Sequence, residues 1–155
     1  MSPAEITQHF YQKIPISKEI GIQVLDVSSR HARVSVPLKP NINHVQTAFG
    51  GSIYSAAALS CYALFQSLSQ QAGGLSDELV IQQGTIRYLR PIRNDFTIQA
   101  LLATAGDEVR FIKGLQTYGK ARLLLKAEVS CDGHLCAVFE GIYVYSGQFL
   151  FKIKP

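Results

Sequence analysis

The chain has 155 residues, of which 47% are hydrophobic and 17% are charged, so it is long enough to bury the core of one domain. Three cysteines without a CxxC spacing favour neither a disulfide framework nor a zinc site. The first residues lack the basic and then apolar pattern of a signal peptide, so the cytoplasm is the expected compartment.

The net charge of +4 is unevenly distributed, because most of the excess lies in residues 87–126. Such a basic region can contact the phosphates of a nucleotide-bearing ligand, or it can be a solvated strand face. The charges form no continuous basic run and match no nucleic-acid module, so no nucleic-acid partner is expected.

The first forty residues predict one helix followed by two strands. Ser2 can cap the helix, and Pro3 suits its first turn. Alternation of polar and apolar side chains indicates the strands, and His31 is expected in the exposed turn between them. The expected ranges are 3–13 for the helix, 22–27 and 32–38 for the strands, and 28–31 for the turn.

Pro40 is expected to end the second strand, and residues 41–49 to form a loop before a long helix over 51–72. This helix is apolar nearly all round, which is typical of a helix buried on every side. A membrane span is the alternative, but serines and glutamines interrupt the apolar run, so no membrane association is expected. Gly73 and Gly74 are expected to end the helix.

The rest of the chain predicts five strands in an antiparallel meander. Asp132-Gly133 is a strong signal for a two-residue hairpin turn. A sheet of this many strands curls, and one apolar helix can fill its concave face, so the expected fold class is α+β in a single domain over 1–155. The expected strands cover 79–89, 97–105, 110–118, 121–131 and 135–145.

Four features resemble the hot-dog-fold acyl-CoA thioesterase superfamily over roughly residues 15–146. Asn43 stands seven residues before the pair Gly50-Gly51, and this pair opens the long helix. A later strand reads IRYLRP over 86–91, like the family pattern I-x-Y-x-x-P, and two long strands end the sheet. The pattern P-N-x-N-H…T-x-F-G-G-S over 40–52 is most similar to the thioesterase-like domain that follows an acetyltransferase in some bacterial proteins.

The resemblance implies a homodimer whose sheets join edge to edge, often paired again into a dimer of dimers. It also implies a site at the dimer interface and, as substrate, a thioester of coenzyme A or of an acyl-carrier protein. No cofactor is expected beyond the coenzyme A that is part of the substrate, and four scattered histidines without an acidic cluster predict no metal.

The catalytic candidates lie in the loop and at the start of the long helix. Thioester hydrolysis passes through an oxyanion, and a helix start offers free N–H groups, so Gly51 with Gly50 or Ser52 is the expected oxyanion site. Asn43 matches a family position that orients the reactants, and His44 is the candidate base. The alternatives are glycines that only permit tight packing, and a His44 that only stabilises its loop.

The acyl chain is expected to run along the apolar helix, where Tyr54, Tyr62 and Phe65 could line or close a tunnel or be ordinary core residues. Arg90 and Arg93 are expected to contact the coenzyme A phosphates. The full set of substrate-binding candidates is Phe49, Gly50, Tyr54, Gln83, Thr85, Tyr88, Arg90 and Arg93.

The chain departs from the best-known family pattern at two positions. Phe49 stands where one branch has histidine, and Ala58 stands where that branch has a helix aspartate or glutamate. No acidic residue occurs between Asp26 and Asp77. Two interpretations stay open, a thioesterase and a non-catalytic acyl-CoA binding module. A hydratase or dehydratase of the same fold is disfavoured because it needs the missing helix acid.

Overall fold

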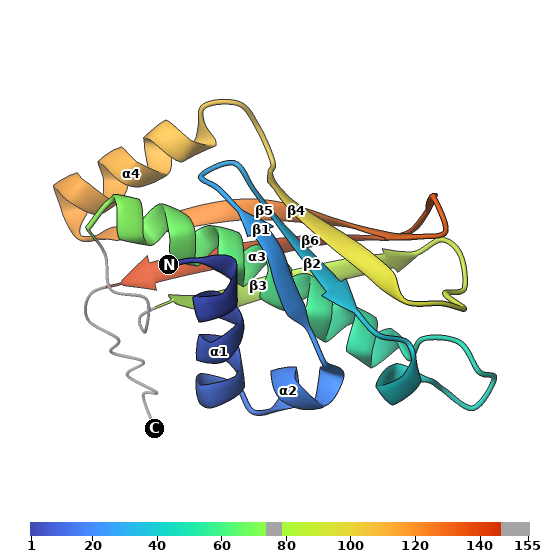
Figure 1. The fold of residues 1–155 in the computed structure, drawn as a ribbon. Helices are drawn as coiled ribbons and strands as arrows, with labels where there is room; N and C mark the ends of the chain where they lie inside the picture. Colours follow the sequence, from blue (N-terminus) through green and yellow to red (C-terminus); the bar gives the residue numbers. More distant parts are fainter. Residues whose placement is uncertain (74–78, 147–155) are drawn as a thin grey trace, which may run out of the picture.

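The computed structural model describes residues 1–73 and 79–146, which form one curved antiparallel sheet around a long helix (Figure 1). The helices are α1 (Pro3–Lys13), α2 (Ile16–Ile20), α3 (Gly50–Gln71) and α4 (Asp107–Tyr118), with a short 3₁₀ turn η1 (Lys39–Asn41). The strands are β1 (Gln23–Val27), β2 (His31–Val36), β3 (Leu79–Tyr88), β4 (Phe96–Leu102), β5 (Lys120–Cys131) and β6 (His134–Ser146). The expected α+β arrangement is confirmed.

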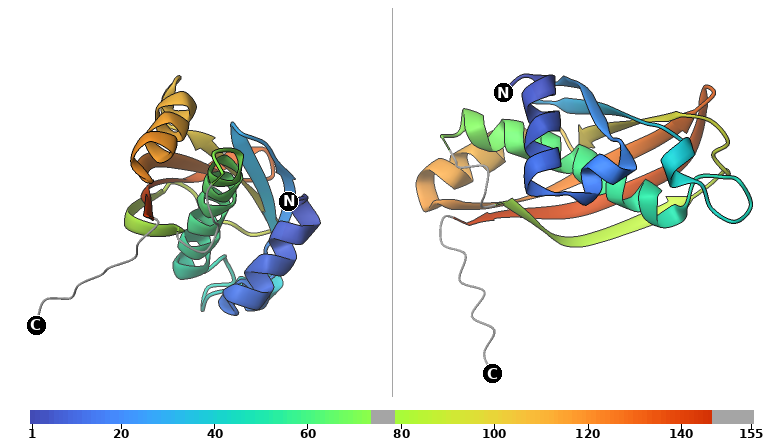
Figure 2. Two further views of the ribbon diagram at one scale, coloured as in Figure 1. Left: turned by 90° about the vertical axis from the view of Figure 1, so that its left-hand side faces the viewer. Right: turned by 60° about the horizontal axis from the view of Figure 1, so that its bottom comes forward.

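The strand order across the sheet is β1-β2-β4-β5-β6-β3, with every neighbouring pair antiparallel. The expected meander is therefore wrong, because β3 pairs with β6 and not with β4. The reason is the helix between β2 and β3: α3 crosses the concave face and delivers the chain to the opposite edge (Figure 2). As a result β3 is an edge strand that runs beside α3.

Helix α3 supplies the centre of the core. Ala56, Ala63 and Leu64 are fully buried, as the apolar pattern predicts. Its buried serines are tolerated because their hydroxyls donate to the helix backbone, Ser60 to the Ala57 carbonyl at 2.7 Å and Ser69 to the Phe65 carbonyl at 2.9 Å. Among the described helices, none is long and apolar enough to cross a membrane.

The expected N-terminal helix is confirmed as α1. The Ser2 hydroxyl accepts from the Glu5 N–H while the Glu5 carboxylate accepts from the Ser2 N–H, which is a capping box. On the opposite face, the buried Phe10 ring packs against Tyr62 of α3 with ring centroids 5.7 Å apart. The cap and the apolar face together dock α1 against the central helix.

The strand expected over 110–118 is wrong, because this segment is helix α4. Phe111 and Leu115 are buried one helical turn apart, and Asp107 favours the positive end of the helix dipole. Gly119 ends the helix in the left-handed conformation with φ of 64°. Of the branched and aromatic residues that suggested a strand, Phe111 and Leu115 pack on one helical face, whereas Tyr118 is 74% exposed.

Smaller corrections concern the first hairpin and the segments beside it. His31 is the first residue of β2 and is half-buried, so it is not an exposed turn residue. β2 ends at Val36, before η1, and the short helix α2 was not expected. The hairpin at Asp132-Gly133 is confirmed, since both residues have positive φ, 51° and 75°. Gly73 follows α3 with φ of 80°, and Gly74 lies outside the described residues.

If α4 packs as described, Phe111→Ala should lower the free energy of unfolding by about 3–5 kcal/mol. Phe111 is 2% exposed and its ring centroid lies 4.9 Å from that of Phe65. Chemical denaturation followed by circular dichroism measures the loss. The matched control is Val109→Ala on the same helix, which is 67% exposed and should change the stability by less than about 0.5 kcal/mol. Equal losses in the two variants would contradict this packing.

Candidate functional site

The loop before α3 is held together by the side chain of Asn43. The Asn43 Oδ1 accepts from the N–H groups of Val45 and Thr47, both at 3.0 Å, and its amide donates to the Thr47 hydroxyl at 2.9 Å. The backbone of Asn43 and Thr47 adds a further hydrogen bond of 2.7 Å. Asn43 therefore shapes the loop, and His44 lies at its exposed tip.

A second asparagine, Asn41, anchors this loop to the core, a role that no sequence pattern indicated. Asn41 is 3% exposed, and its amide donates to the carbonyls of Ile20 and Pro37 at 2.8 Å and 2.7 Å. Its own carbonyl accepts from the Phe49 N–H at 2.7 Å. The start of α3 is thereby fixed relative to α2 and β2.

Helix α3 starts at a position open to solvent. Phe49 is the N-cap residue and makes no side-chain capping hydrogen bond, and Gly51 is exposed. Among the hydrogen bonds of the described residues, no acceptor takes the N–H groups of Gly50, Gly51 or Ser52, as is usual for the first turn of an uncapped helix. Three adjacent donors and the positive end of the helix dipole are therefore directed at the same point.

The two glycines make close approaches that a larger residue would block. A Cβ on Gly51 would meet the ring of Phe49, which is 56% exposed and lies over the helix start. A Cβ on Gly50 would lie 3.2 Å from the Tyr88 hydroxyl, which donates to the Gly50 carbonyl at 2.7 Å. Partial burial, and then Tyr54, raises the pKa of Tyr88, so its phenol stays protonated at neutral pH.

Tyr88 and the helix start border a groove of about 390 Å³, which we call the entrance groove. Its walls come from the end of the loop, the first turn of α3 and the segment after β3. Of the substrate-binding candidates, the structure brings Gly50, Tyr88 and Arg90 together here. The lining residues are Ala48, Gly50, Ile53 and the run Tyr88 to Ile92.

Other candidates lie away from this groove. Gln83 and Thr85 are exposed on β3, opposite Ile142 and Glu140 of β6. Arg93 is exposed and does not line the entrance groove. Cys61 is fully buried, and burial raises the pKa of its thiol, which argues against a nucleophile.

Comparison with known proteins identifies the family. The family model described as "Putative thioesterase (yiiD_Cterm)" matches residues 3–147. The chain belongs to this family. A crystal structure of the "putative thioesterase from Shewanella oneidensis" is similar with 29% identity and a TM-score of 0.78, covering 93% of this chain and 96% of that chain.

Two further solved structures share the fold. A protein of unknown function from Chlorobaculum tepidum has 25% identity and a TM-score of 0.84, over 94% of this chain and 97% of that chain. A protein from Pseudomonas aeruginosa described as a "Probable Thioesterase" has 21% identity and a TM-score of 0.75, over 93% and 95% of the two chains. The expected hot-dog fold is therefore confirmed.

This member of the thioesterase family has a second, larger pocket of about 680 Å³ on the same helix, which we call the α1 pocket. Helix α3 contributes Ala58, Leu59 and Tyr62, and β3 contributes Leu79, Val80 and Ile81. His9 and Lys13, one turn apart on α1, form part of its wall and were not among the candidates. The Ala58 carbonyl accepts from the Tyr143 hydroxyl at 2.7 Å. No carboxylate is present among the described residues that line this pocket.

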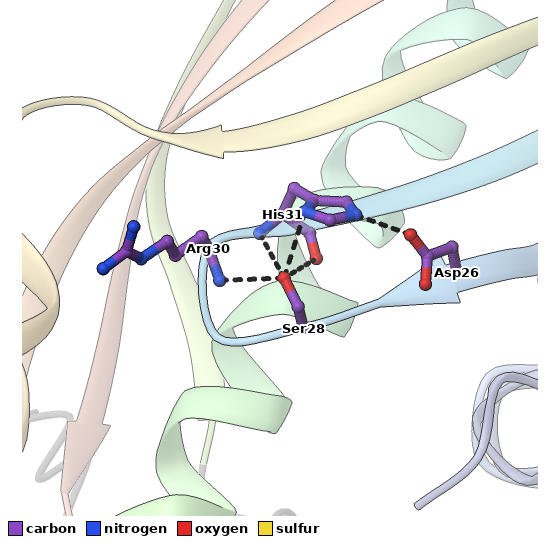
Figure 3. A network of polar contacts seen from close by, with 4 residues as sticks. All are labelled: Asp26, Ser28, Arg30 and His31. Carbon is purple, nitrogen blue, oxygen red and sulfur yellow. Dashed lines mark hydrogen bonds and ion pairs between the residues drawn. The ribbon is translucent and has the colours of Figure 1, made fainter.

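A serine, a histidine and an aspartate meet on the hairpin of β1 and β2 (Figure 3). His31 Nε2 lies 2.6 Å from an Asp26 oxygen, and its Nδ1 lies 3.0 Å from the Ser28 hydroxyl. These are the residue types of a hydrolytic triad. However, the Ser28 oxygen already accepts from the N–H groups of Arg30 and His31, both at 3.1 Å, so it stabilises a turn. Among the described residues, no pocket is lined by Asp26, Ser28 and His31.

Within residues 1–73 and 79–146, no three histidine, cysteine, aspartate or glutamate side chains come together.

The pKa of Asp26 offers a test of the hairpin contacts. It lies below its ordinary value, chiefly because His31 hydrogen-bonds the carboxylate. A lowered pKa means that the stabilisation is present above the ordinary aspartate pKa of about 3.9 and is lost as the pH falls through the folded-state value. His31→Ala should therefore raise the pKa of Asp26 in an NMR titration. His134→Ala, at an exposed position in another hairpin, should leave it unchanged. An equal pKa of Asp26 in both variants would contradict the hydrogen bond between His31 and Asp26.

Proposed function

We propose that this protein hydrolyses thioesters of coenzyme A, or of an acyl-carrier protein, by attack of water on a carbonyl bound at the start of α3. One observation carries the proposal: the helix begins without a side-chain cap, at an exposed glycine beside the entrance groove. Membership of the thioesterase family supports the reaction class. We further propose that the enzyme acts in the cytoplasm.

The chemistry follows from where negative charge develops. Water adds to the thioester carbon, the carbonyl oxygen becomes an oxyanion, and collapse of this intermediate expels the thiolate. The N–H of Gly51, with that of Gly50 or Ser52, would stabilise the oxyanion. Tyr88 assists, because its hydroxyl donates to the carbonyl of the peptide that carries the Gly51 N–H. A hydrogen bond to this carbonyl polarises the peptide and strengthens its N–H as a donor.

Asn43 and His44 take different roles in this proposal. The Asn43 side chain is used within the loop, so it positions the loop and does not touch the water. His44 at the loop tip is the candidate base, since an imidazole can accept the proton that water loses. A loop fixed by Asn43 and Asn41 would present His44 to a thioester held at the helix start.

We propose a homodimer, paired through the edge strand β3, with the site at the subunit interface. An edge strand carries unpaired N–H and C=O groups that another strand can satisfy. Three large apolar side chains on or beside this edge are exposed, Ile81 at 41%, Tyr88 at 51% and Leu89 at 46%. An interface over this edge would cover them and bring a second chain to the entrance groove.

The alternative is a binding module that holds an acyl thioester without hydrolysing it. It is favoured by Ala58, since a methyl group there supplies no carboxylate to activate water. Both functions use the same N–H donors at the start of α3, so the same surface would bind the thioester in each case. The two functions differ in whether the bound thioester is hydrolysed.

Gly51→Pro tests the oxyanion site with Gly51→Ala as its matched control. Both variants add a Cβ that meets the Phe49 ring, but only proline removes the N–H. Proline is tolerated in the first turn of a helix. Thiol release from acyl-coenzyme A substrates should show a kcat about 10²–10³-fold lower for Gly51→Pro than for Gly51→Ala.

Equal kcat values in the two variants would show that the Gly51 N–H does not stabilise the oxyanion. Absence of thiol release from wild type over the whole substrate panel, with coenzyme A thioesters still bound, would favour the binding module. Circular dichroism of both variants verifies that α3 is retained.

The arginines near the groove make a second test. Arg90 lines the entrance groove, whereas Arg93 is equally exposed but does not. Arg90→Ala should raise the KM for an acyl-coenzyme A several-fold by removing a phosphate contact, and Arg93→Ala should leave it nearly unchanged. An unchanged KM in Arg90→Ala, or equal increases in both variants, would exclude a specific phosphate contact at Arg90.

A further inference from the structure

Two pockets lie at opposite ends of the contact between α3 and β3. The entrance groove takes Gly50 and Ile53 from α3 and Tyr88 from the end of β3. The α1 pocket takes residues 58, 59 and 62 from α3 and residues 79–81 from the start of β3. Because α3 and β3 run beside each other (Figure 2), the direct path from the helix start to the α1 pocket follows this contact.

Tyr54 lies between the two pockets on α3 and β3, the two elements that border both of them. On α3 it falls between Ile53 and Ala58. On β3 its hydroxyl lies against Gly84, which falls between residues 79–81 and Tyr88. Its ring meets Phe139 of β6 edge-on, with centroids 5.2 Å apart and an interplanar angle of 89°. Tyr54 is not among the residues that line either pocket.

Gly84 makes room for this tyrosine. A Cβ on Gly84 would collide with the Tyr54 hydroxyl and approach the Phe139 ring at 3.1 Å. Gly84 pairs with Gly141 across the sheet, so neither strand presents a side chain where the tyrosine reaches the sheet. The half-buried ring of Tyr54 is thus packed against β3 and β6.

We propose that Tyr54 is the residue that limits acyl length, separating a small acyl site at the entrance groove from the larger α1 pocket. This inference rests on the proposed function and names its substrate class, thioesters of short acyl groups. Positions 51 and 58 are seven residues apart, about 10 Å along a helix and on nearly the same face. A longer chain that starts at Gly51 therefore points toward the α1 pocket and meets Tyr54 on its way.

The two other aromatic residues considered for this role have different positions. Tyr62 lines the α1 pocket itself, beyond Tyr54. Phe65 is fully buried and packs against Phe111 and Tyr143, with centroid distances of 4.9 Å and 5.6 Å. Phe65 therefore belongs to the core. Of the three aromatic residues, only Tyr54 lies between the two pockets.

The test compares wild type, Tyr54→Val and Tyr54→Phe on acetyl-, hexanoyl- and decanoyl-coenzyme A. Wild type should prefer the shorter chains. Tyr54→Val opens the contact and should raise the ratio of kcat/KM for decanoyl over acetyl by at least about tenfold, the discrimination that a few methylene groups give in an apolar pocket. Tyr54→Phe keeps the ring and should keep the wild-type ratio.

Two controls make the result specific. Tyr11→Ala removes another half-buried tyrosine, whose hydroxyl donates to the Ile22 carbonyl at 2.9 Å outside both pockets, and should not change the ratio. Tyr54→Val combined with Ala58→Phe fills the α1 pocket and should abolish the gain for decanoyl. Circular dichroism verifies that each variant is folded, and Tyr54→Leu replaces Tyr54→Val if the latter is not.

Calorimetry with non-hydrolysable thioether analogues of the same three chain lengths separates this inference from the proposed hydrolysis. If no protein releases thiol but Tyr54→Val binds the decanoyl analogue at least about tenfold more tightly than wild type, hydrolysis fails and the length limit stands. An unchanged chain-length ratio in both turnover and binding, or the same change in Tyr11→Ala, overturns the role of Tyr54.

Discussion

The burial of most of α3 is the constraint on which the rest of the structure depends. A helix that is apolar around its circumference cannot lie on one face of a flat sheet, so the sheet must curve around it and further elements must close the gaps. β2, β4, β5 and β6 cover the helix from the concave face, while α1 closes one flank and β3 the other. The order of the strands follows, because the strand after the helix can dock only at the free edge.

The same constraint decides where a ligand can approach. A helix enclosed along its length is accessible at its first turn and where its cover is thin, beside the edge strand. At the first turn, Gly51 is exposed and no side chain caps the helix, so the first N–H groups are free donors. The Tyr88 hydroxyl donates to the Gly50 carbonyl beside them. Beside the edge strand lie the α1 pocket and Tyr54. Anion-binding donors and apolar space thus occur on one helix, as a thioester with a polar carbonyl and an apolar chain requires.

The sequence was sufficient for features that depend on local signals. The capping box at Ser2, the Asp132-Gly133 turn and the apolar periodicity of α3 are each determined by residues close together in the chain. Helix α4 was missed because its branched and aromatic residues suit a strand as well as one face of a helix, and packing against Phe65 decides between them. The place of β3 depends on the path of α3 across the sheet, which no local pattern encodes.

The candidate site shows the same division. The helix start at Gly50-Gly51 was predictable, since glycines after a polar loop and before an apolar run indicate it. The difference between Arg90 and Arg93 was not, because it depends on which side of the segment after β3 faces the groove. The role of Asn41 was equally hidden, because its partners come from α2, the end of β2 and the start of α3.

The bracing of the loop by Asn43 has a consequence for the energetics of recognition. Ordering a mobile loop around a ligand costs conformational entropy, which is subtracted from the binding free energy. Here the Asn43 side chain and the Asn41 anchor order the loop when the chain folds, in the absence of any ligand. Association with a small molecule at the helix start then requires little rearrangement, so the loop should have nearly the same backbone in the empty and the occupied protein.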